Sequence, residues 1–430
     1  MTQNFTRRDM MQTTAAIAGG CWLGTSTNQA AAASSNDKLN IAVVGIGGRG
    51  RANLNALGRE NIVALCDVDD QRAGNAYEKF PRARKFTDFR RMFDAMDKQI
   101  DVVVVSTPDH THFHPSMAAM ELGKHLYCEK PMAHTVEETR RMTDMAAKSK
   151  VATQLGVQRH TIENVHRVVE LVQAGAIGQV AEVHSWIGGS RGMPARPTDS
   201  PAVPKHLDWD LWLGPAASRP YSPAFAPYNW RFWWDFGTGE TGNWGCHILD
   251  IPFWALGLKY PTRVDATGPK IDGQRTPKSM ATKFAFAADG DRKALTLHWY
   301  HNSNPPILKK HGLSGKGANT LFIGSDGMLI CGFGMRKLLP EEQFKDTKAP
   351  DRSIPNSPGF HREWVNACKG GPAATCEFGY SGPLTETVLL GNAAYRAGGG
   401  FDWNAKTLQS SGNDNSEKFL RPHFREGWKI

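Results

Sequence analysis

The chain has 430 residues and a formal net charge of +9, and 40% of its residues are hydrophobic. This length is large for a single hydrophobic core, so we expect two domains. The basic residues are spread along the chain without a long run, which argues against a nucleic-acid-binding protein.

The N-terminal residues 1–33 are typical of a twin-arginine export signal. Arg7 and Arg8 precede a mildly apolar stretch, Ala15–Leu23, and small residues follow at Ala30–Ala33. The apolar stretch is too short and too polar to span a membrane. We therefore expect no membrane span and export to the periplasm, with a disordered cytoplasmic tail as the alternative.

A glycine-rich loop follows the first expected strand, Ile41–Val44. Gly45, Gly47 and Gly50 have the spacing Gly-x-Gly-x-x-Gly, in which the glycines allow a tight turn, approach of a pyrophosphate, and close packing of a helix. Asp67 ends the next apolar run, at the distance expected for a carboxylate that binds a ribose hydroxyl. The residues predicted to contact a dinucleotide here are Gly45, Gly47, Gly48, Arg49, Gly50 and Asp67.

Acidic residues after the second strand favour NAD over NADP. Asp67, Asp69 and Asp70 should repel the 2'-phosphate of NADP. Arg72 could instead attract that phosphate, so NADP remains the less favoured cofactor.

The chain continues as strands that alternate with helices. Val102–Val105 is a continuous β-branched run followed by the loop 106–112, and His125–Cys128 leads into Glu129-Lys130-Pro131. Val151–Val157 closes this parallel set. Ligands bind at the carboxyl ends of such strands. The cofactor contacts predicted from these loops are Thr107, Pro108, His112, Glu129 and Lys130.

In order and spacing, these motifs resemble the oxidoreductase family named for glucose-fructose oxidoreductase, inositol dehydrogenase and a rhizopine catabolism protein (Gfo/Idh/MocA). The resemblance implies an α/β protein with an N-terminal Rossmann NAD-binding domain, residues 38–157. It also implies a C-terminal α+β substrate-binding domain, residues 158–430, with a large, mostly antiparallel open sheet. Relatives often pair through this sheet, so a homo-oligomer is expected.

The residues favour the second sheet independently. Ala181–Ile187, Ala281–Phe286 and Leu295–Trp299 alternate between apolar and polar side chains, and 324–327 is typical of a turn between two strands. The proline-rich segment 188–227 is too long for an ordinary connection, and we predict a loop near the substrate mouth. A helix is expected over Pro383–Arg396, and a flexible turn over Gln409–Lys418.

A tryptophan-rich segment, 228–258, is the expected substrate site. Its glycine-dense loop precedes a helix predicted from Asn243 to Leu256, on which Asn243, His247, Asp250 and Trp254 share one face. Pro252 lies inside this span and could kink the helix or end it early. Flat aromatic walls with a few fixed polar groups suit a sugar ring. The residues predicted to bind substrate are Asn243, His247, Asp250, Trp230 and Trp234.

This segment resembles the glycine-rich motif of the family, which usually ends Asp-x-x-x-His. His247 matches the histidine, Lys130 matches the lysine that lies opposite it, and Asn243 replaces the acid. Asparagine can orient a histidine or bind a hydroxyl, but it cannot accept a proton at neutral pH.

Oxidation of a carbinol removes a hydride and a hydroxyl proton in nearly the same step. His247 has a suitable intrinsic pKa to accept that proton. Lys130, partly desolvated beside a nicotinamide, should have a lowered pKa and can hydrogen-bond the developing oxyanion. These catalytic roles could be exchanged between the two residues.

No metal site is predicted. The histidines at 110, 112 and 114 are close together, but on a loop beside a cofactor their spacing favours backbone and phosphate contacts. The seven cysteines include no Cys-x-x-Cys pair, and spacing does not decide whether Cys368 and Cys376 form a disulfide.

The main functional hypothesis is an exported NAD(P)-dependent oxidoreductase acting on a carbinol of a sugar, sugar derivative or cyclic polyol. One alternative is a glycosidase that uses NAD transiently to oxidise a sugar ring and cleave the glycosidic bond by elimination. The other is a sensor that binds nucleotide and sugar without turnover, which Asn243 would permit.

Overall fold

The structure is a computed structural model that describes residues 38–429. The predicted export signal, residues 1–33, lies outside the described residues. A six-stranded sheet with the order β3-β2-β1-β4-β5-β6 forms the first part of the fold, and all its neighbouring strands are parallel. Its strands are β1 (Asn40–Val44), β2 (Asn61–Cys66), β3 (Arg84–Phe86), β4 (Val102–Val105), β5 (His125–Cys128) and β6 (Thr153–Leu155).

The central strands of this sheet are apolar throughout because both faces are covered. Val102 to Val105 are completely buried in β4, which pairs with β1 on one side and β5 on the other. The strand order reverses between β1 and β4, and this is the place where ligands bind in open α/β sheets. The helices of this part are α2 (Gly48–Ala56), α3 (Asp70–Lys79), α4 (Phe89–Met96), α5 (Phe113–Glu121) and α6 (Val136–Ser149), with 3-10 turns η1 (Asp97–Gln99), η2 (Asp109–Thr111) and η3 (Gln158–Thr161).

A nine-stranded sheet with the order β13-β12-β11-β7-β10-β9-β8-β14-β15 forms the second part. Its strands pair antiparallel except for β7 and β10, which are parallel neighbours. The strands are β7 (Val180–Ile187), β8 (Arg263–Thr267), β9 (Met280–Phe286), β10 (Leu295–His301), β11 (Thr320–Gly324), β12 (Met328–Cys331), β13 (Arg336–Leu339), β14 (Phe401–Asn404) and β15 (Gln409–Ser411). The expected two-domain α/β fold with a mostly antiparallel second sheet is therefore confirmed.

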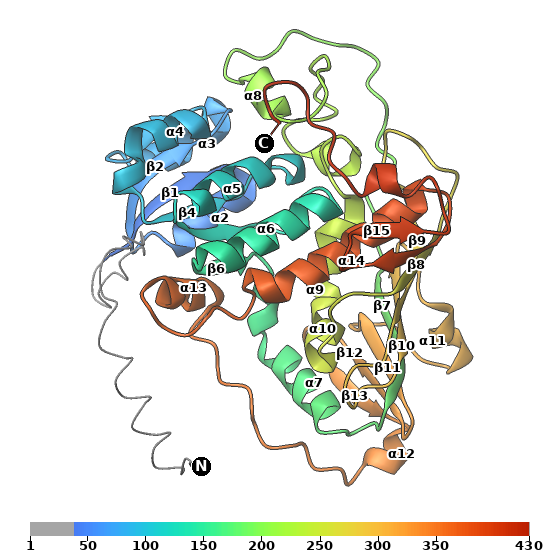
Figure 1. The fold of residues 1–430 in the computed structure, drawn as a ribbon. Helices are drawn as coiled ribbons and strands as arrows, with labels where there is room; N and C mark the ends of the chain where they lie inside the picture. The colour runs from blue at the N-terminus through green and yellow to red at the C-terminus, as the bar shows by residue number, and fades with distance from the viewer. Residues whose placement is uncertain (1–37, 430) are drawn as a thin grey trace, which may run out of the picture. The chain divides into compact units, whose positions relative to one another are not determined.

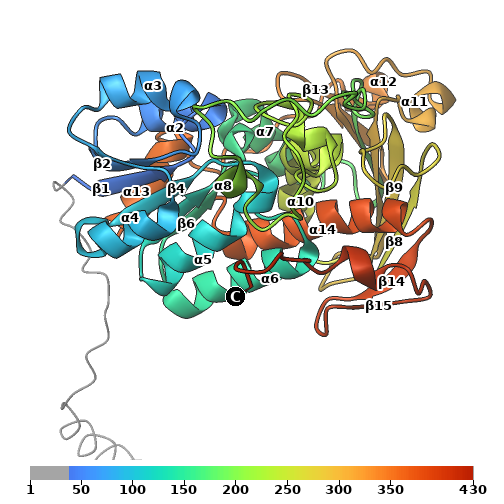
Figure 2. The same ribbon diagram turned by 90° about the horizontal axis from the view of Figure 1, so that it is seen from above.

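One face of the second sheet packs on helices (Figures 1 and 2), among them α10 (Asp250–Leu256) and α14 (Phe378–Arg396). Leu295, Leu297 and Trp299 of β10 point into this core, while His298 and Tyr300, which alternate with them, point to the opposite face. The helices are α7 (Glu163–Gln173), α8 (Trp209–Leu213), α9 (Cys246–Ile248), α10 (Asp250–Leu256), α11 (Pro306–Lys310), α12 (Glu341–Phe344), α13 (Phe360–Cys368) and α14 (Phe378–Arg396), with η4 (Asn229–Phe232), η5 (Thr241–Gly245) and η6 (Glu417–Phe419).

Two expectations about the C-terminal third are corrected. Helix α14 begins at Phe378, not Pro383, because the Glu377 side chain accepts hydrogen bonds from the free backbone N–H groups of Gly379 and Tyr380. The stretch 409–418 holds β15 and η6 where a flexible turn was expected. Cys368 and Cys376 are separate buried thiols. Among the described helices, none is both long and apolar enough to cross a bilayer.

Candidate active site

A cavity of about 630 Å³ lies at the carboxyl ends of β1, β2, β4 and β5, and the tryptophan-rich segment closes its other side. This volume is within the range of small-molecule and cofactor sites. The predicted residues that line the cavity are Gly45, Gly47, Gly48, Arg49, Asp67, Thr107, Pro108, His112, Glu129, Lys130, Trp230, Asn243 and His247. The structure thus brings the two predicted catalytic residues together with the glycine loop.

The glycine loop is shaped by steric limits at two positions. Gly45 has a φ of +82°, and a Cβ there would lie 2.8 Å from the backbone of Ser106. Gly50 does not line the cavity; a Cβ on it would lie 1.8 Å from the carbonyl oxygen of Gly45. Gly50 therefore allows α2 to pack on the loop, and its part in cofactor binding is indirect.

The cavity residues around this loop fit a dinucleotide. Asp67 Oδ2 accepts hydrogen bonds from the backbone N–H groups of Ile46 (2.8 Å) and Gly47 (3.3 Å), and burial raises the pKa of its carboxyl. Thr107 Oγ1 is buried without a hydrogen-bond partner at the edge of the same cavity. The Arg72 side chain lies beside Gly47 and Gly48, where an anionic pyrophosphate would pass.

Lys130 is fixed by its neighbours in the second domain. Its Nζ donates to the backbone carbonyl of Asn243 (2.7 Å) and to Asn243 Oδ1 (2.9 Å). Asn243 Nδ2 in turn donates to Glu240 Oε2 (2.9 Å), which sets the orientation of the amide. Glu240 is buried and also pairs with Arg191 (3.2 Å). The amide is suited to this position because it accepts from an ammonium and donates to a carboxylate.

The protonation of Lys130 changes close to neutral pH. Burial, with a smaller effect from the nearby Arg231 cation, lowers the pKa of its ammonium to about 8. Asn243 takes two of the hydrogens on Nζ. Below that pKa the charged amine has a third N–H that points elsewhere, and above it the neutral amine has a lone pair in that place.

His247 is neutral at physiological pH. Burial, followed by the charge of Lys130, lowers the pKa of its imidazole well below the usual value. Its Nδ1 is buried and has no hydrogen-bond partner, although the residue lines the cavity.

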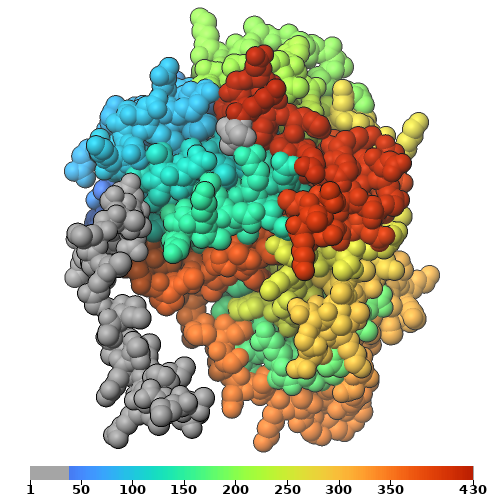
Figure 3. Space-filling model, in the orientation of Figure 1, coloured from blue at the N-terminus to red at the C-terminus, as the bar shows by residue number. Residues whose placement is uncertain are grey.

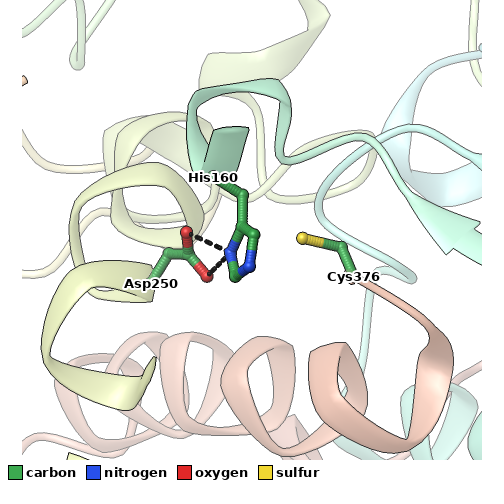
Figure 4. Close-up of side chains that lie close together, drawn as sticks. All are labelled: His160, Asp250 and Cys376. Carbon is green, nitrogen blue, oxygen red and sulfur yellow. Dashed lines mark hydrogen bonds and ion pairs between the residues drawn. The ribbon is translucent and has the colours of Figure 1, made fainter. Parts of the chain in front are cut away.

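Asp250 does not line the cavity, which corrects the expectation that it binds substrate. It is buried against η3, where His160 Nδ1 lies 2.9 Å from Asp250 Oδ2 and Tyr380 Oη donates to Oδ1 (2.6 Å). Figure 4 shows the His160 ring between Asp250 and Cys376, and Trp254 stacks on that ring at 3.9 Å. This cluster holds η3 to α10 in the interior.

The prediction that Asp250 shares the site with His247 is wrong because of the local helix geometry. The segment expected as one helix contains the π-helical turn η5, the short helix α9, and a break at Leu249 before α10. A π-turn contains more residues than an α-turn and rotates everything that follows it. Asn243 and His247 consequently share the cavity, whereas Asp250 turns away.

Trp234 is also away from the cavity, which corrects its predicted role. Its ring is buried, its Nε1 donates to the carbonyl of Asp272 (3.2 Å), and Arg396 lies over its face. Trp230 remains at the cavity wall, with Arg231 over its ring. In an irregular loop the sequence pattern does not predict which tryptophan faces the cavity and which is buried in the interior.

The histidines of the 106–114 region bind backbone carbonyls, as the sequence indicated. His112 lies 2.8 Å from the carbonyl oxygens of both Pro131 and Thr107, which ties the two cofactor loops together. His110 contacts the carbonyls of Phe236 and Trp212, and His114 contacts that of Trp428.

Several cavity residues were missed. Arg159 follows β6 and stands over the rings of Trp244 and Phe333, and the ion pairs among residues 38–429 do not include it. The rule that ligands bind where parallel strands end could have found Arg159. Arg191 comes from the long loop 188–227, for which a place near the mouth was predicted.

Trp428 reaches the cavity from the C-terminal tail. Its ring contacts Phe89, and Arg425 Nη1 pairs with Asp210 (2.6 Å). In Figure 3 the C-terminal residues, in red, lie against the blue first-domain surface and the green segment. The sequence alone does not predict contacts between segments so far apart along the chain.

Comparison with known proteins places both parts of the chain in one family. Residues 39–157 match the model described as the oxidoreductase family, NAD-binding Rossmann fold, and residues 164–292 match its C-terminal alpha/beta domain. The chain belongs to the Gfo/Idh/MocA oxidoreductase family. Its N-terminal domain is therefore an NAD-binding Rossmann domain, in agreement with the expected cofactor.

The sequences of two named relatives match part of this chain. Inositol 2-dehydrogenase of Salmonella paratyphi B is 29% identical over 152 residues, which are 34% of this chain and 45% of that enzyme. Levoglucosan dehydrogenase of Pseudarthrobacter phenanthrenivorans is 26% identical over 231 residues, 51% of each chain. The chain thus spans about half the length of these relatives.

A solved structure agrees over a longer range. The WlbA dehydrogenase from Bordetella pertussis, in complex with NADH and UDP-GlcNAcA, has a TM-score of 0.60 at 16% identity. The match covers 85% of this chain and 99% of the WlbA chain. At this identity the comparison establishes the shared fold.

Proposed function

We propose that the protein is an NAD-dependent oxidoreductase that acts on a carbinol of a sugar, sugar derivative or cyclic polyol. The observation that carries the proposal is that Lys130 and His247, from different domains, line the same cavity as the glycine loop. NAD supplies the hydride acceptor when it is bound. The names of the related inositol and levoglucosan dehydrogenases support the substrate class.

The geometry favours Lys130 as the proton acceptor. A general base works best when its pKa is near the operating pH, and the pKa of Lys130 is about 8. In its neutral form Lys130 keeps both hydrogen bonds to Asn243 and presents its lone pair to the substrate hydroxyl. Burial and the charge of Lys130 lower the pKa of His247 and disfavour its charged form, so we assign it to binding and orienting that hydroxyl as a neutral imidazole.

Arg159 favours a substrate with an acidic group. Its guanidinium lies at the cavity wall among aromatic rings, burial lowers its pKa, and no carboxylate of the described chain neutralises it. Arg159 is half-buried, and partial burial of a cation without a counterion carries a cost that solvent reduces. A carboxylate or phosphate on the substrate would supply that counterion through charge-assisted hydrogen bonds.

We also propose that the protein is exported to the periplasm. Arg7 and Arg8 before an apolar stretch support this location. A fusion of residues 1–37 to a reporter should reach the periplasm, and the same fusion with both arginines changed to lysine should remain in the cytoplasm.

The function is tested by screening sugars, polyols and sugar acids with the purified protein and NAD. An increase in the absorbance of reduced nicotinamide with some of these compounds supports a dehydrogenase. Cleavage of aryl glycosides with no net reduction of NAD would instead support the glycosidase alternative. Ligand binding without either reaction would support a sensor.

Asn243→Asp should shift the pH profile of oxidation to higher pH. The new carboxylate favours the charged ammonium, so the Lys130 pKa rises above about 8 and less neutral amine is present at pH 7. The rising limb of kcat against pH is expected to move up by about 1–3 pH units. The matched variant combines Asn243→Asp with Glu240→Gln, so that the acid and the amide exchange places. It keeps the new carboxylate beside Lys130 but removes the repulsion between the two carboxylates. An unshifted limb in both variants would contradict the role of Lys130 as base.

Arg159→Met should weaken binding of acidic substrates selectively. Loss of a charge-assisted hydrogen bond is expected to raise KM about 10–100-fold for a sugar acid, with kcat little changed. Neutral sugars of the same ring form should change far less, and Arg82→Met at an exposed position serves as the control. An equal loss for acidic and neutral compounds would show that Arg159 only supports the wall of the cavity.

A further inference from the structure

Two histidines and a glutamate meet on the face of the second sheet that points away from the helical core. Glu182 and His184 lie two residues apart on β7, and His298 lies on the parallel neighbour β10, where it pairs in register with His184. Side chains two residues apart on a strand share a face, so all three project from the same surface. None of them lines the cavity described above.

The three side chains lie close together around one carboxylate oxygen. The Nε2 atoms of His184 and His298 lie 3.1 Å and 3.0 Å from the same oxygen, Glu182 Oε1. Their rings are stacked, with centroids 4.5 Å apart and an angle of 5° between the planes. These three groups are among the sets of described side chains whose ligand atoms are close enough to share one metal ion.

Among the described residues, the only polar contact of His184 Nε2 is with Glu182 Oε1, at 3.1 Å. The His184 side chain is 5% exposed, and the geometry of this contact is not that of a hydrogen bond. Its other nitrogen, Nδ1, lies 3.2 Å from the hydroxyl of Tyr300. If Nδ1 donates to Tyr300, the Nε2 lone pair faces a carboxylate oxygen, and a cation between them would relieve that contact.

We propose that Glu182, His184 and His298 bind a divalent transition-metal ion of the zinc type. Zinc bonds to histidine and carboxylate are about 2.0–2.2 Å long, so neighbouring ligand atoms in a tetrahedral site are about 3.3–3.4 Å apart. The observed separations of 3.0 Å and 3.1 Å need a small expansion, and one of the two stacked rings must rotate so that both Nε2 lone pairs point at the ion. Imidazole ligands select transition metals, because calcium and magnesium prefer oxygen.

The site has room for a further ligand from solvent. In the single chain the side chain of Glu182 is 39% exposed and that of His298 is 18% exposed, so an ion can reach the cluster there and keep a water molecule. The cluster of His160, Asp250 and Cys376 is less suitable, since those side chains are fully buried and Asp250 already accepts from Tyr380. A bound ion would cross-link β7 and β10, the one parallel pair of the described second sheet.

The test is zinc binding to the purified protein, measured by calorimetric titration with Zn²⁺ and by metal analysis after dialysis. We expect one Zn²⁺ per chain and a higher unfolding temperature in its presence. Glu182→Gln, which keeps the side-chain shape, and His298→Ala should each lower the affinity more than 100-fold. Tyr300→Phe should lower it about 10-fold because it removes support for a ligand.

The control variant is His423→Ala, since His423 is an exposed histidine outside this sheet. It should bind Zn²⁺ as the wild type does. The proposal is overturned if the wild type binds no Zn²⁺, or if Glu182→Gln and His298→Ala bind it as well as the wild type does. The readout is independent of NAD and of sugar oxidation, so it does not depend on the proposed function.

Discussion

Lys130→Met should lower kcat for carbinol oxidation by about 10²–10⁴, the usual contribution of a general acid or base. The variant keeps an unbranched side chain one atom shorter than lysine, and it removes both the proton acceptor and the hydrogen bonds to Asn243. The rising limb of the pH profile near pH 8 should disappear with it, because the Lys130 pKa of about 8 produces that limb. Stopped-flow measurement of NAD reduction from pH 6 to 10 checks both results.

Two controls separate catalysis from folding and cofactor binding. Lys148→Met, at an exposed position of α6, should react like the wild type. Titration of Lys130→Met with NAD should show that the cofactor still binds, since the glycine loop and Asp67 are unchanged. If the variant keeps wild-type kcat, another group accepts the proton.

His247→Gln should also lower kcat by about 10²–10⁴, but with a different pH dependence. Because His247 is already neutral, its loss leaves the charge around Lys130 unchanged. The limb near pH 8 should therefore remain while the rate falls at every pH. Comparison of the two pH profiles assigns the roles that the sequence left open.

The result that would reverse this assignment is equally specific. If the limb is lost in His247→Gln and kept in Lys130→Met, His247 is the base and Lys130 stabilises the oxyanion. His423→Gln, at an exposed position near the C-terminus, is the control for a histidine change.

The first domain was largely predictable because its strands and loops are local patterns. A β-branched run covered on both faces, followed by a glycine or polar loop, identifies each parallel strand and its ligand-binding end. Gly45, Asp67, Thr107 and Lys130 were placed by that rule, and the structure brings all four to one cavity.

The errors come from geometry that residue patterns do not encode. The π-turn η5 turns Asp250 toward His160, although helical spacing put it with His247. Arg191 and Trp428 reach the cavity from a long loop and from the C-terminal tail, through tertiary contacts alone. Arg159 could have been found, because it lies in η3, shortly after the last parallel strand, β6.

The central claim is that one cavity holds NAD and a carbinol between Lys130 and His247. The most direct measurement is nicotinamide absorbance after NAD and a sugar or polyol substrate are added to the wild type and to Lys130→Met. The account predicts NAD binding by both proteins and rapid reduction by the wild type alone. Failure of the wild type to bind NAD, or reduction by Lys130→Met at the wild-type rate, would contradict it.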